Sequence, residues 1–192
     1  MAEAMRDYRG IAVIRAEPPC GMITLRGKPE AATALARIGD RLGVAMPEPL
    51  GVTQKGGNAL LWMSPDEMLA ICPASKLSGH LTALDKALKG HHALAVDVSD
   101  ARVRFSVSGP HAREVLAKLV PIDMSHEGFS PGMVRRTRLG QVAAALWLDE
   151  TPDGVSAIQI VCFRSVGDYV FDALKIAAQP GSEVHLFTHP AA

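Results

Sequence analysis

The chain runs twice through the same order of hydrophobic patterns, and this repetition constrains its fold more than any other feature. Apolar residues recur every three or four positions in the helical segments and at alternate positions in the strands. The elements expected in the first half are a strand at 22–26, a helix from Pro29 to Gly43, a loop at 47–58, a hairpin over 59–63 and 67–72, a helix ending at Gly90 and a strand at 93–98. This order is the βαββαβ unit of ferredoxin-like folds.

The second half begins the pattern again. Val103, Phe105 and Val107 alternate with polar residues, which predicts a strand with one buried face. The further elements expected are a helix opened by Gly109-Pro110, a loop at 121–132, strands at 134–138, 141–148 and 156–162 with a turn at Pro152-Asp153-Gly154, a helix carrying Val166, Val170, Leu174 and Ala177, and a short strand (184–187) or a disordered tail. Ser165 and Asp168 have the spacing of a capping box. The sequence therefore predicts an α+β fold of two tandem ferredoxin-like halves packed as one module.

The expected domain boundaries follow from these patterns. They are an N-terminal arm over 1–20, a first α+β half over 21–100, a second half over 101–180 and a tail over 181–192. The arm contains an apolar run over 11–14, followed by Pro18-Pro19. Because extended segments of this kind commonly add to a neighbouring protein, we expect the arm to dock on a partner.

The balance of charge argues against some classes of partner. Twenty basic residues match twenty acidic ones, so the formal net charge is zero. Nucleic acids and anionic membranes are bound through basic surfaces, and neither is an expected partner. Neutral proteins tend to associate, so we expect the isolated chain to bind copies of itself through an apolar surface.

The three cysteines indicate a reducing compartment. Cys20, Cys72 and Cys162 are odd in number and far apart, which is not a disulfide framework. Cys72 and Cys162 lie in apolar runs and are expected in the core. The first ten residues have no apolar stretch typical of a signal peptide, and no run is long enough to span a membrane. We therefore expect a cytoplasmic protein.

Most catalytic and cofactor motifs are absent from the sequence. It contains neither a GxGxxG dinucleotide motif, nor a P-loop, nor a GxSxG nucleophile elbow. The histidines do not form a metal-binding pattern, and His80, His91, His92, His111 and His126 are interpreted as surface residues. We accordingly expect no catalytic, cofactor-binding or metal-binding residue in this chain.

One segment resembles a binding turn. In Asp97-Val98-Ser99-Asp100-Ala101-Arg102, two acids and a serine lie between strands, and Arg102 or Arg104 could hold a carboxylate. In the simpler interpretation, which we favour, Asp97 and Ser99 hydrogen-bond local backbone amides.

A second candidate is the basic group Arg135, Arg136 and Arg138. Its simpler interpretation is a solvated edge strand that is protected by charge. The alternative is an interface that pairs with an acidic partner.

The segment from Val96-Asp97-Val98-Ser99 through Val107-Ser108-Gly109-Pro110 to Val115-Leu116 resembles the signature of the glycine-cleavage T-protein and YgfZ-like superfamily. Ile122-Asp123, Phe129-Ser130-Pro131-Gly132 and Arg164-Ser165 fit its continuation. Within the superfamily, the chain is most similar to the gamma subunits of heterotetrameric sarcosine oxidase. The signature covers about half of the chain, from Val96 to Leu174.

This resemblance implies membership of a complex that oxidatively demethylates sarcosine to glycine, forms hydrogen peroxide and passes the one-carbon unit to tetrahydrofolate. It implies alpha, beta and delta subunits as partners. FAD, FMN and NAD are then expected on alpha and beta, zinc on delta, and tetrahydrofolate on a T-protein-like region of alpha. The gamma subunit is expected to be a structural, non-catalytic member that binds no cofactor.

Two other functions remain open. The first is a free-standing folate-binding protein of the T-protein/YgfZ-like kind in one-carbon or iron–sulfur metabolism, although the cysteine motif of YgfZ-like proteins is not found around any of the three cysteines. The second is a ferredoxin-like regulatory module that binds a small amino acid between its halves.

Overall fold

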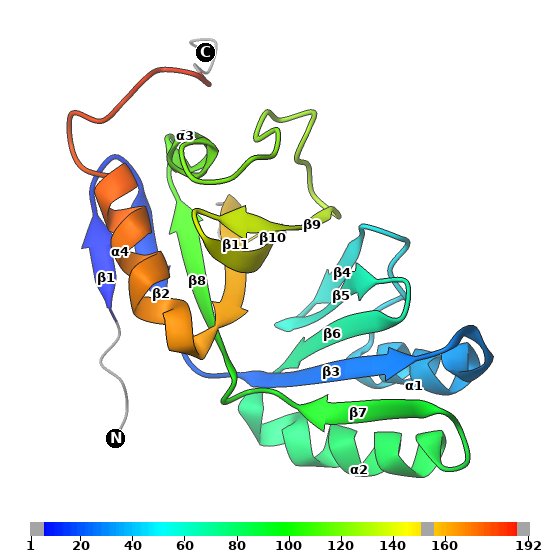
Figure 1. The fold of residues 1–192 in the computed structure, drawn as a ribbon. Coiled ribbons are helices and arrows are strands. Elements are labelled where there is room, and N and C mark those ends of the chain that lie inside the picture. Colours follow the sequence, from blue (N-terminus) through cyan, green and yellow to red (C-terminus); the bar gives the residue numbers. More distant parts are fainter. Residues whose placement is uncertain (1–5, 151–155, 188–192) are drawn as a thin grey trace. The chain divides into compact units, whose positions relative to one another are not determined.

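The computed structural model describes residues 6–150 and 156–187, which divide into two compact units (Figure 1). One unit, here called the inserted unit, comprises residues 19–102. The other, here called the split unit, is built from the residues up to Pro18 together with those from Val103 onward. The chain thus leaves the split unit after its first strands and returns to it after completing the inserted unit.

The inserted unit is a five-stranded antiparallel sheet with two helices. Its elements are β3 (Gly21–Gly27), α1 (Ala32–Leu42), β4 (Val52–Lys55), β5 (Asn58–Ser64), β6 (Glu67–Cys72), α2 (Leu77–Leu88) and β7 (Ala93–Asp97), with short 3₁₀ turns at Pro29–Ala31 and Ala74–Lys76 before the helices. The strand order is β4-β5-β6-β3-β7. Without β4, this is the strand order of a ferredoxin-like unit, as the sequence predicts.

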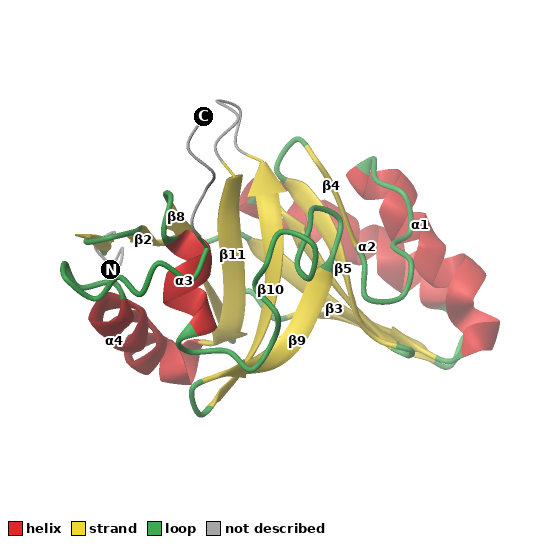
Figure 2. Cartoon of the chain, turned by 90° about the horizontal axis from the view of Figure 1, so that it is seen from above, coloured by secondary structure: helices red, strands yellow, loops and turns green. Residues whose placement is uncertain are grey.

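The helices of the inserted unit form where the apolar spacing places them. Leu35 and Ile38 of α1 and Leu84 of α2 are buried against Ile23 and Leu25 of β3. Figure 2 shows both helices on the same side of the sheet. The first helix ends at Gly43 with φ 69°, a left-handed conformation in which glycine has no steric penalty.

One strand of the inserted unit is missing from the sequence prediction. The segment expected as a loop over 47–58 contains β4, which pairs with β5 from Val52 opposite Leu61 to Lys55 opposite Asn58. The glycines and prolines around this segment form the turns at its two ends. Glu48 accepts a hydrogen bond from the Gly51 N–H at 2.8 Å before the strand, and Gly56 and Gly57 have positive φ after it.

The split unit has a six-stranded sheet and two helices. Its elements are β1 (Asp7–Arg9), β2 (Val13–Ala16), β8 (Arg102–Ser108), α3 (Ala112–Ala117), β9 (Val134–Leu139), β10 (Val142–Glu150), β11 (Ser156–Phe163) and α4 (Gly167–Ala177), with a 3₁₀ turn at Arg164–Val166. The strand order is β1-β2-β8-β11-β10-β9. Phe105 and Val107 of β8, Leu116 of α3 and Leu174 of α4 share one buried core.

The split unit has the same internal order as the inserted unit, with one substitution. The strand next to β3 in the inserted unit is β7, which follows α2 in the chain. The corresponding place next to β8 is filled by β2, from the N-terminal segment. The sequence therefore predicts both ferredoxin-like halves, but the second half is completed by residues that precede the first.

The expectation of a separate arm that docks on a partner is accordingly wrong for residues 6–16. Ile14 pairs with Val107 of β8 and is fully buried, and Ala12 is 2% exposed. The apolar run of the N-terminal segment is explained by this burial within its own chain.

Two further expectations differ from the structure. Ser165 and Asp168 form no capping box, because a 3₁₀ turn precedes α4 and no side chain caps the helix; Asp168 instead pairs with Arg6. For residues 184–187, where the sequence predicts either a short strand or a disordered tail, the strand is not formed. The turn expected at Pro152-Asp153-Gly154 lies outside the described residues.

Within the described ranges, no helix is both long and apolar enough to cross a lipid bilayer.

Candidate functional site

The Asp97 segment is a hydrogen-bonded turn. Asp97 Oδ1 accepts hydrogen bonds from the Ser99 backbone N–H at 2.9 Å and from the Ser99 hydroxyl at 2.6 Å. Ser99 Oγ in turn accepts a hydrogen bond from the Met22 N–H at 2.9 Å. The interpretation that these side chains satisfy local backbone amides is therefore confirmed for Asp97, whereas Ser99 bonds the distant amide of Met22 and so ties the end of β7 to the start of β3.

The two arginines proposed to hold a ligand carboxylate lie beside carboxylates of their own chain. Arg102 is 3.9 Å from Glu67 Oε1, and Arg104 is 3.9 Å from Glu17 Oε2. All four side chains are mostly buried. These pairs neutralise the arginines in place, so the structure supports a packing role for them.

The basic residues of β9 lie on an edge strand of the split unit, as the sequence predicts. The Arg135 guanidinium donates to the Val134 carbonyl at 3.1 Å, and the Arg138 guanidinium donates to the side-chain oxygen of Gln141 at 3.1 Å. An acidic partner for this edge remains a prediction.

The histidines differ in their surroundings. His91 and His92 are exposed, whereas His80 is buried and its Nδ1 accepts a hydrogen bond from Arg41 Nε at 3.4 Å. Burial, and then the charges of Arg41 and Lys76, lower the pKa of His80. The expectation of surface histidines is therefore wrong for His80, whose buried side chain extends from α2 and contacts Arg41 of α1. Among the described residues, no group of three or more His, Cys, Asp or Glu side chains is placed to bind a metal.

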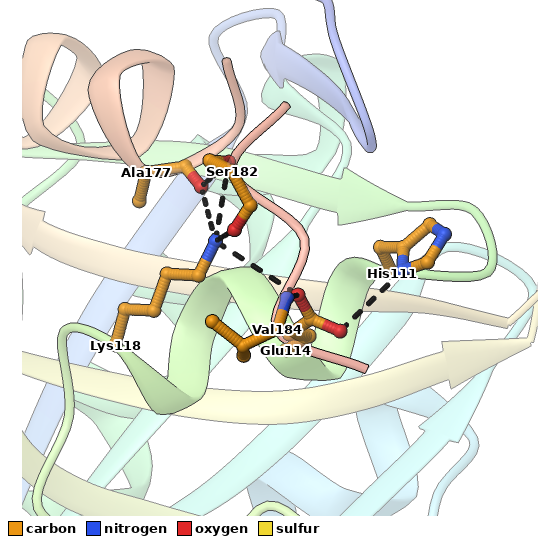
Figure 3. Close-up of polar contacts among 6 residues, drawn as sticks. All are labelled: His111, Glu114, Lys118, Ala177, Ser182 and Val184. Atoms are coloured by element: carbon orange, nitrogen blue, oxygen red, sulfur yellow. Dashed lines mark hydrogen bonds and ion pairs between the residues drawn. The ribbon is translucent and has the colours of Figure 1, made fainter. Parts of the chain in front are cut away.

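The most organised polar cluster of the split unit surrounds Glu114 on α3, and sequence reasoning did not single it out (Figure 3). Glu114 is 2% exposed. Its Oε1 accepts a hydrogen bond from the Val184 backbone N–H at 2.5 Å, and its Oε2 is 3.5 Å from His111 Nδ1. Figure 3 shows the carboxylate between His111 and Lys118. A single buried carboxylate thus holds the segment after α4 against α3.

Lys118, one turn after Glu114, completes the attachment. Its Nζ donates to the carbonyl oxygens of Ala177 at 3.0 Å and Ser182 at 2.5 Å, and lies 4.0 Å from Glu114 Oε1. The Ser182 hydroxyl also donates to the Ala177 carbonyl at 3.0 Å. An ammonium group near the last carbonyls of α4 is favourable, because the C-terminus of a helix carries partial negative charge.

The electrostatics of Glu114 result from opposing effects. Burial raises the pKa of this carboxyl, while the hydrogen bond from Val184 and the proximity of His111 and Lys118 lower it, and the net direction is downward. The carboxylate is therefore charged at neutral pH. It is compensated by its neighbours, as a buried charge must be.

The signal for this cluster is present in the sequence. Glu114 and Lys118 are four residues apart, and His111 precedes Glu114 by three, so all three lie along one side of α3. Glu114 also directly precedes the apolar pair Val115 and Leu116, which the periodicity assigns to the core. Its position at the margin of the buried stripe therefore indicates a partner for the carboxylate.

A neighbouring loop is held by Arg113. Its guanidinium donates to the carbonyl oxygens of Met124 at 2.8 Å and Ser125 at 2.9 Å. Asp123 Oδ1 accepts from the Ser125 N–H at 2.8 Å, and this bond lowers the pKa of Asp123. A Cβ at Gly128 would lie 2.3 Å from Asp123 Oδ2, so a larger residue there would displace the Asp123 side chain.

Apolar surface is exposed on α4 of the split unit. Tyr169 is 47% exposed and Ile176 is 64% exposed. Together with Leu119, they line a groove of about 480 Å³, which is flanked by Lys118 and Asp172. A second exposed apolar pair, Leu94 and Val96, lies on the edge strand β7 of the inserted unit. Both surfaces expose apolar side chains to solvent.

Comparison with protein families gives one match over most of the chain. Residues 26–179 match the model of the sarcosine oxidase, gamma subunit family. The sarcosine oxidase subunit gamma of an Arthrobacter species is 34% identical over 152 residues, which cover 77% of this chain and 73% of that protein.

The fold is also similar to solved structures. A chain of the heterotetrameric sarcosine oxidase from Corynebacterium sp. U-96 aligns with a TM-score of 0.76 and 25% identity, over 90% of this chain and 87% of that chain. The glycine cleavage system aminomethyltransferase T from Bartonella henselae aligns with a TM-score of 0.64 over 90% of this chain and 48% of that protein. At 14% identity, the second similarity concerns the fold alone.

Proposed function

Because the chain belongs to the sarcosine oxidase, gamma subunit family, we propose that it is the gamma subunit of a heterotetrameric sarcosine oxidase and serves there as a non-catalytic assembly subunit. The observation that carries this proposal is the agreement between sequence and fold. The family match spans residues 26–179, and the fold similarity to the Corynebacterium oxidase covers 90% of the chain.

The contacts of the polar residues support a scaffolding role. Asp97 is hydrogen-bonded within its own turn, Arg102 lies beside Glu67, and Glu114 holds the segment around Val184. Each of these groups is engaged in holding the chain together. The exposed apolar residues on α4 and β7 are of the type that permanent subunit interfaces bury.

The reaction of the complex follows from the family. In our proposal, the assembled enzyme demethylates sarcosine to glycine, forms hydrogen peroxide and transfers the one-carbon unit to tetrahydrofolate. FAD, FMN and NAD are assigned to the alpha and beta subunits, zinc to delta and tetrahydrofolate to alpha. This chain binds none of them and contributes packing surface to its partners.

A free-standing folate-binding role is the second candidate. It is favoured by the fold similarity to aminomethyltransferase T, in which a chain like this one corresponds to about half of the enzyme. The sequence identity of 14% supports no transfer of function, and the gamma subunit proposal therefore takes precedence.

Affinity purification of the tagged chain from its native cell tests the proposal. We expect larger subunits to co-purify with it, to carry flavin absorbance and to oxidise sarcosine. The tag is best placed at the C-terminus, because residues 6–16 form part of the split unit. A colourless chain that purifies without partners from cells induced for sarcosine growth would overturn the proposal.

A further inference from the structure

The edge strand β7 presents an open hydrogen-bonding side. The Val98 N–H donates to the Met22 carbonyl at 2.9 Å, and Val96 pairs with Thr24 and Leu94 with Arg26 along β3. In an antiparallel pair, every second residue directs its N–H and C=O to the partner strand. Ala95 and Asp97 therefore direct theirs away from β3.

These outward groups are unpaired. Within the described residues, the Ala95 N–H and C=O and the Asp97 N–H and C=O have no hydrogen-bond partner. An open edge of this kind is a template for another strand, and proteins usually protect it with charge, proline or a covering element. On β7 the two side chains that face away from the helices are Leu94 and Val96, 45% and 46% exposed. This edge is apolar and uncovered.

The same position in the split unit is occupied. Ile14 of β2 faces the helices of its unit, as Ala95 of β7 does. The Ala16 N–H donates to the Arg6 carbonyl at 2.8 Å, so the backbone groups of Ile14 are directed to Tyr8 of β1. In Figure 1, β1 is the outermost strand beside β2, whereas β7 is itself outermost beside β3. In the split unit, the edge that corresponds to the open side of β7 is thus covered by an antiparallel strand.

The surroundings of β7 also suit an added strand. A groove of about 310 Å³ follows the strand beside the end of α2 and is lined by Asp85, Leu88, Lys89, Ala93, Leu94 and Ala95. The alanines leave room on the helix side of the edge, while Leu94 and Val96 provide apolar contact on the other.

We propose that β7 receives an extended strand of another sarcosine oxidase subunit, which adds antiparallel to its free edge. This inference rests on the proposed function, because that function supplies the partner.

The charges around β7 favour one orientation and one composition of the added strand. Lys89, His91 and His92 precede β7 and Asp97 ends it, and all four are exposed. An antiparallel strand with a basic residue near its start and an acidic residue near its end therefore matches the edge. The cross-strand pair of Asp7 with Arg15, 3.6 Å apart between β1 and β2, shows the same device.

Amide hydrogen exchange in the purified complex tests the proposal directly. In the isolated chain, the outward amides of Ala95 and Asp97 should exchange rapidly, while those of Leu94 and Val96 are protected by β3. In the complex, the amides of Ala95 and Asp97 should slow by about tenfold or more, because they gain hydrogen-bond acceptors. The Leu94 and Val96 amides are an internal control on the same strand.

A proline variant provides the second measurement. Ala95→Pro removes only an outward N–H, and proline is tolerated on a strand edge that faces solvent, so the β3–β7 pairing is retained. The variant should keep the melting temperature of Ala95→Ser, a matched control that retains the N–H, and should recover about tenfold less of the other subunits than that control does.

The possible outcomes distinguish strand addition at β7 from the subunit assignment. A complex that forms while the Ala95 and Asp97 amides still exchange rapidly overturns strand addition and leaves the subunit assignment intact. Protection that already develops in the isolated chain and increases with concentration assigns the edge to a second copy and overturns the proposal. A chain that finds no flavoprotein partner overturns the proposed function, and strand addition from a subunit falls with it.

Discussion

The Glu114 carboxylate on α3 accepts a hydrogen bond from the backbone N–H of Val184 at 2.5 Å, across 70 positions of the chain. This contact, together with the bonds from Lys118 to Ala177 and Ser182, attaches the segment after α4 to the body of the split unit. The stability of that segment therefore depends on one buried charge.

Glu114→Gln should lower the free energy of unfolding by about 1 kcal/mol, because a charge-assisted hydrogen bond becomes a neutral one. Limited proteolysis should cleave within 179–187 sooner in this variant than in the natural chain. Glu127→Gln is the matched control, because Glu127 is exposed. Equal cleavage of both variants would show that Glu114 does not hold the segment.

The contribution of Glu114 should also depend on pH. Its pKa is lowered in the folded protein, so the stabilisation is complete above the ordinary glutamate pKa of about 4.3 and is lost as the pH falls through the lower folded value. The difference in melting temperature between the natural chain and Glu114→Gln should consequently shrink on acidification below that ordinary value. A difference that grows on acidification would contradict a lowered pKa.

Replacing Asp97 should affect folding and assembly more than turnover. Asp97→Ala removes the acceptor of two hydrogen bonds in the turn and should cost about 1 kcal/mol, or roughly 2–4 °C in melting temperature. Arg102→Ala should act in the same direction, because it leaves Glu67 without its cation.

Sarcosine turnover per assembled complex measures the alternative for these residues. We expect it to be unchanged in both variants. A variant that assembles normally but loses tetrahydrofolate-dependent activity would show that the segment is a binding site.

Replacing Leu50 by glycine should increase the stability of the folded chain. It follows Pro49 in a turn closed by the hydrogen bond from the Gly51 N–H to the Glu48 carbonyl, and its φ is 62°. This is the third position of a type II turn, where glycine is favoured and a larger residue costs about 1–2 kcal/mol. After allowing for the greater chain entropy of glycine, Leu50→Gly should raise the free energy of unfolding by up to about 1 kcal/mol. Denaturant titration measures it, and a destabilised variant would indicate that the Leu50 side chain makes a stabilising contact.

The cysteines should differ in reactivity. Burial, with smaller contributions from Cys20 and Asp97, raises the pKa of the Cys72 thiol to about 11. Cys162 is also buried, whereas Cys20 is half-buried. Titration of the native chain with a thiol reagent near neutral pH should therefore label Cys20 first, and Cys72 and Cys162 should follow only on unfolding. Three equal rates would contradict this order.

The isolated chain should self-associate through its exposed apolar surface. Ile176 is 64% exposed beside the groove on α4, so Ile176→Lys should weaken association. Lys175→Arg, on the same helix, retains the charge and serves as the control. Light scattering over a range of concentrations measures the effect, and a natural chain that stays monomeric throughout would contradict the expectation.

The sequence predicts those parts of the fold that local periodicity determines. The apolar stripe of Leu35, Ile38 and Leu42, with Gly43 after it, defines α1, and the alternation around Phe105 defines β8. Pairing over long separations has no local signal, so the apolar run around Ile14 suggests an arm when the sequence is considered alone, although it pairs with β8. The same limit applies to one contact of the Glu114 cluster, because Val184 contributes a backbone amide, which its residue type does not reveal.

The place of β2 in the split unit has a consequence for the order in which the protein is made. A ribosome delivers β1 and β2 first, but their neighbour β8 emerges only after the whole inserted unit has been synthesised. The inserted unit, continuous from 19 to 102, can fold as soon as it emerges, whereas Ile14 must wait, exposed and apolar, for a strand about ninety residues away. During that interval, the segment around Ile14 is the part of the split unit most in need of a chaperone. A protein fused before β1 would therefore be attached to the split unit, which is the unit that completes its folding last.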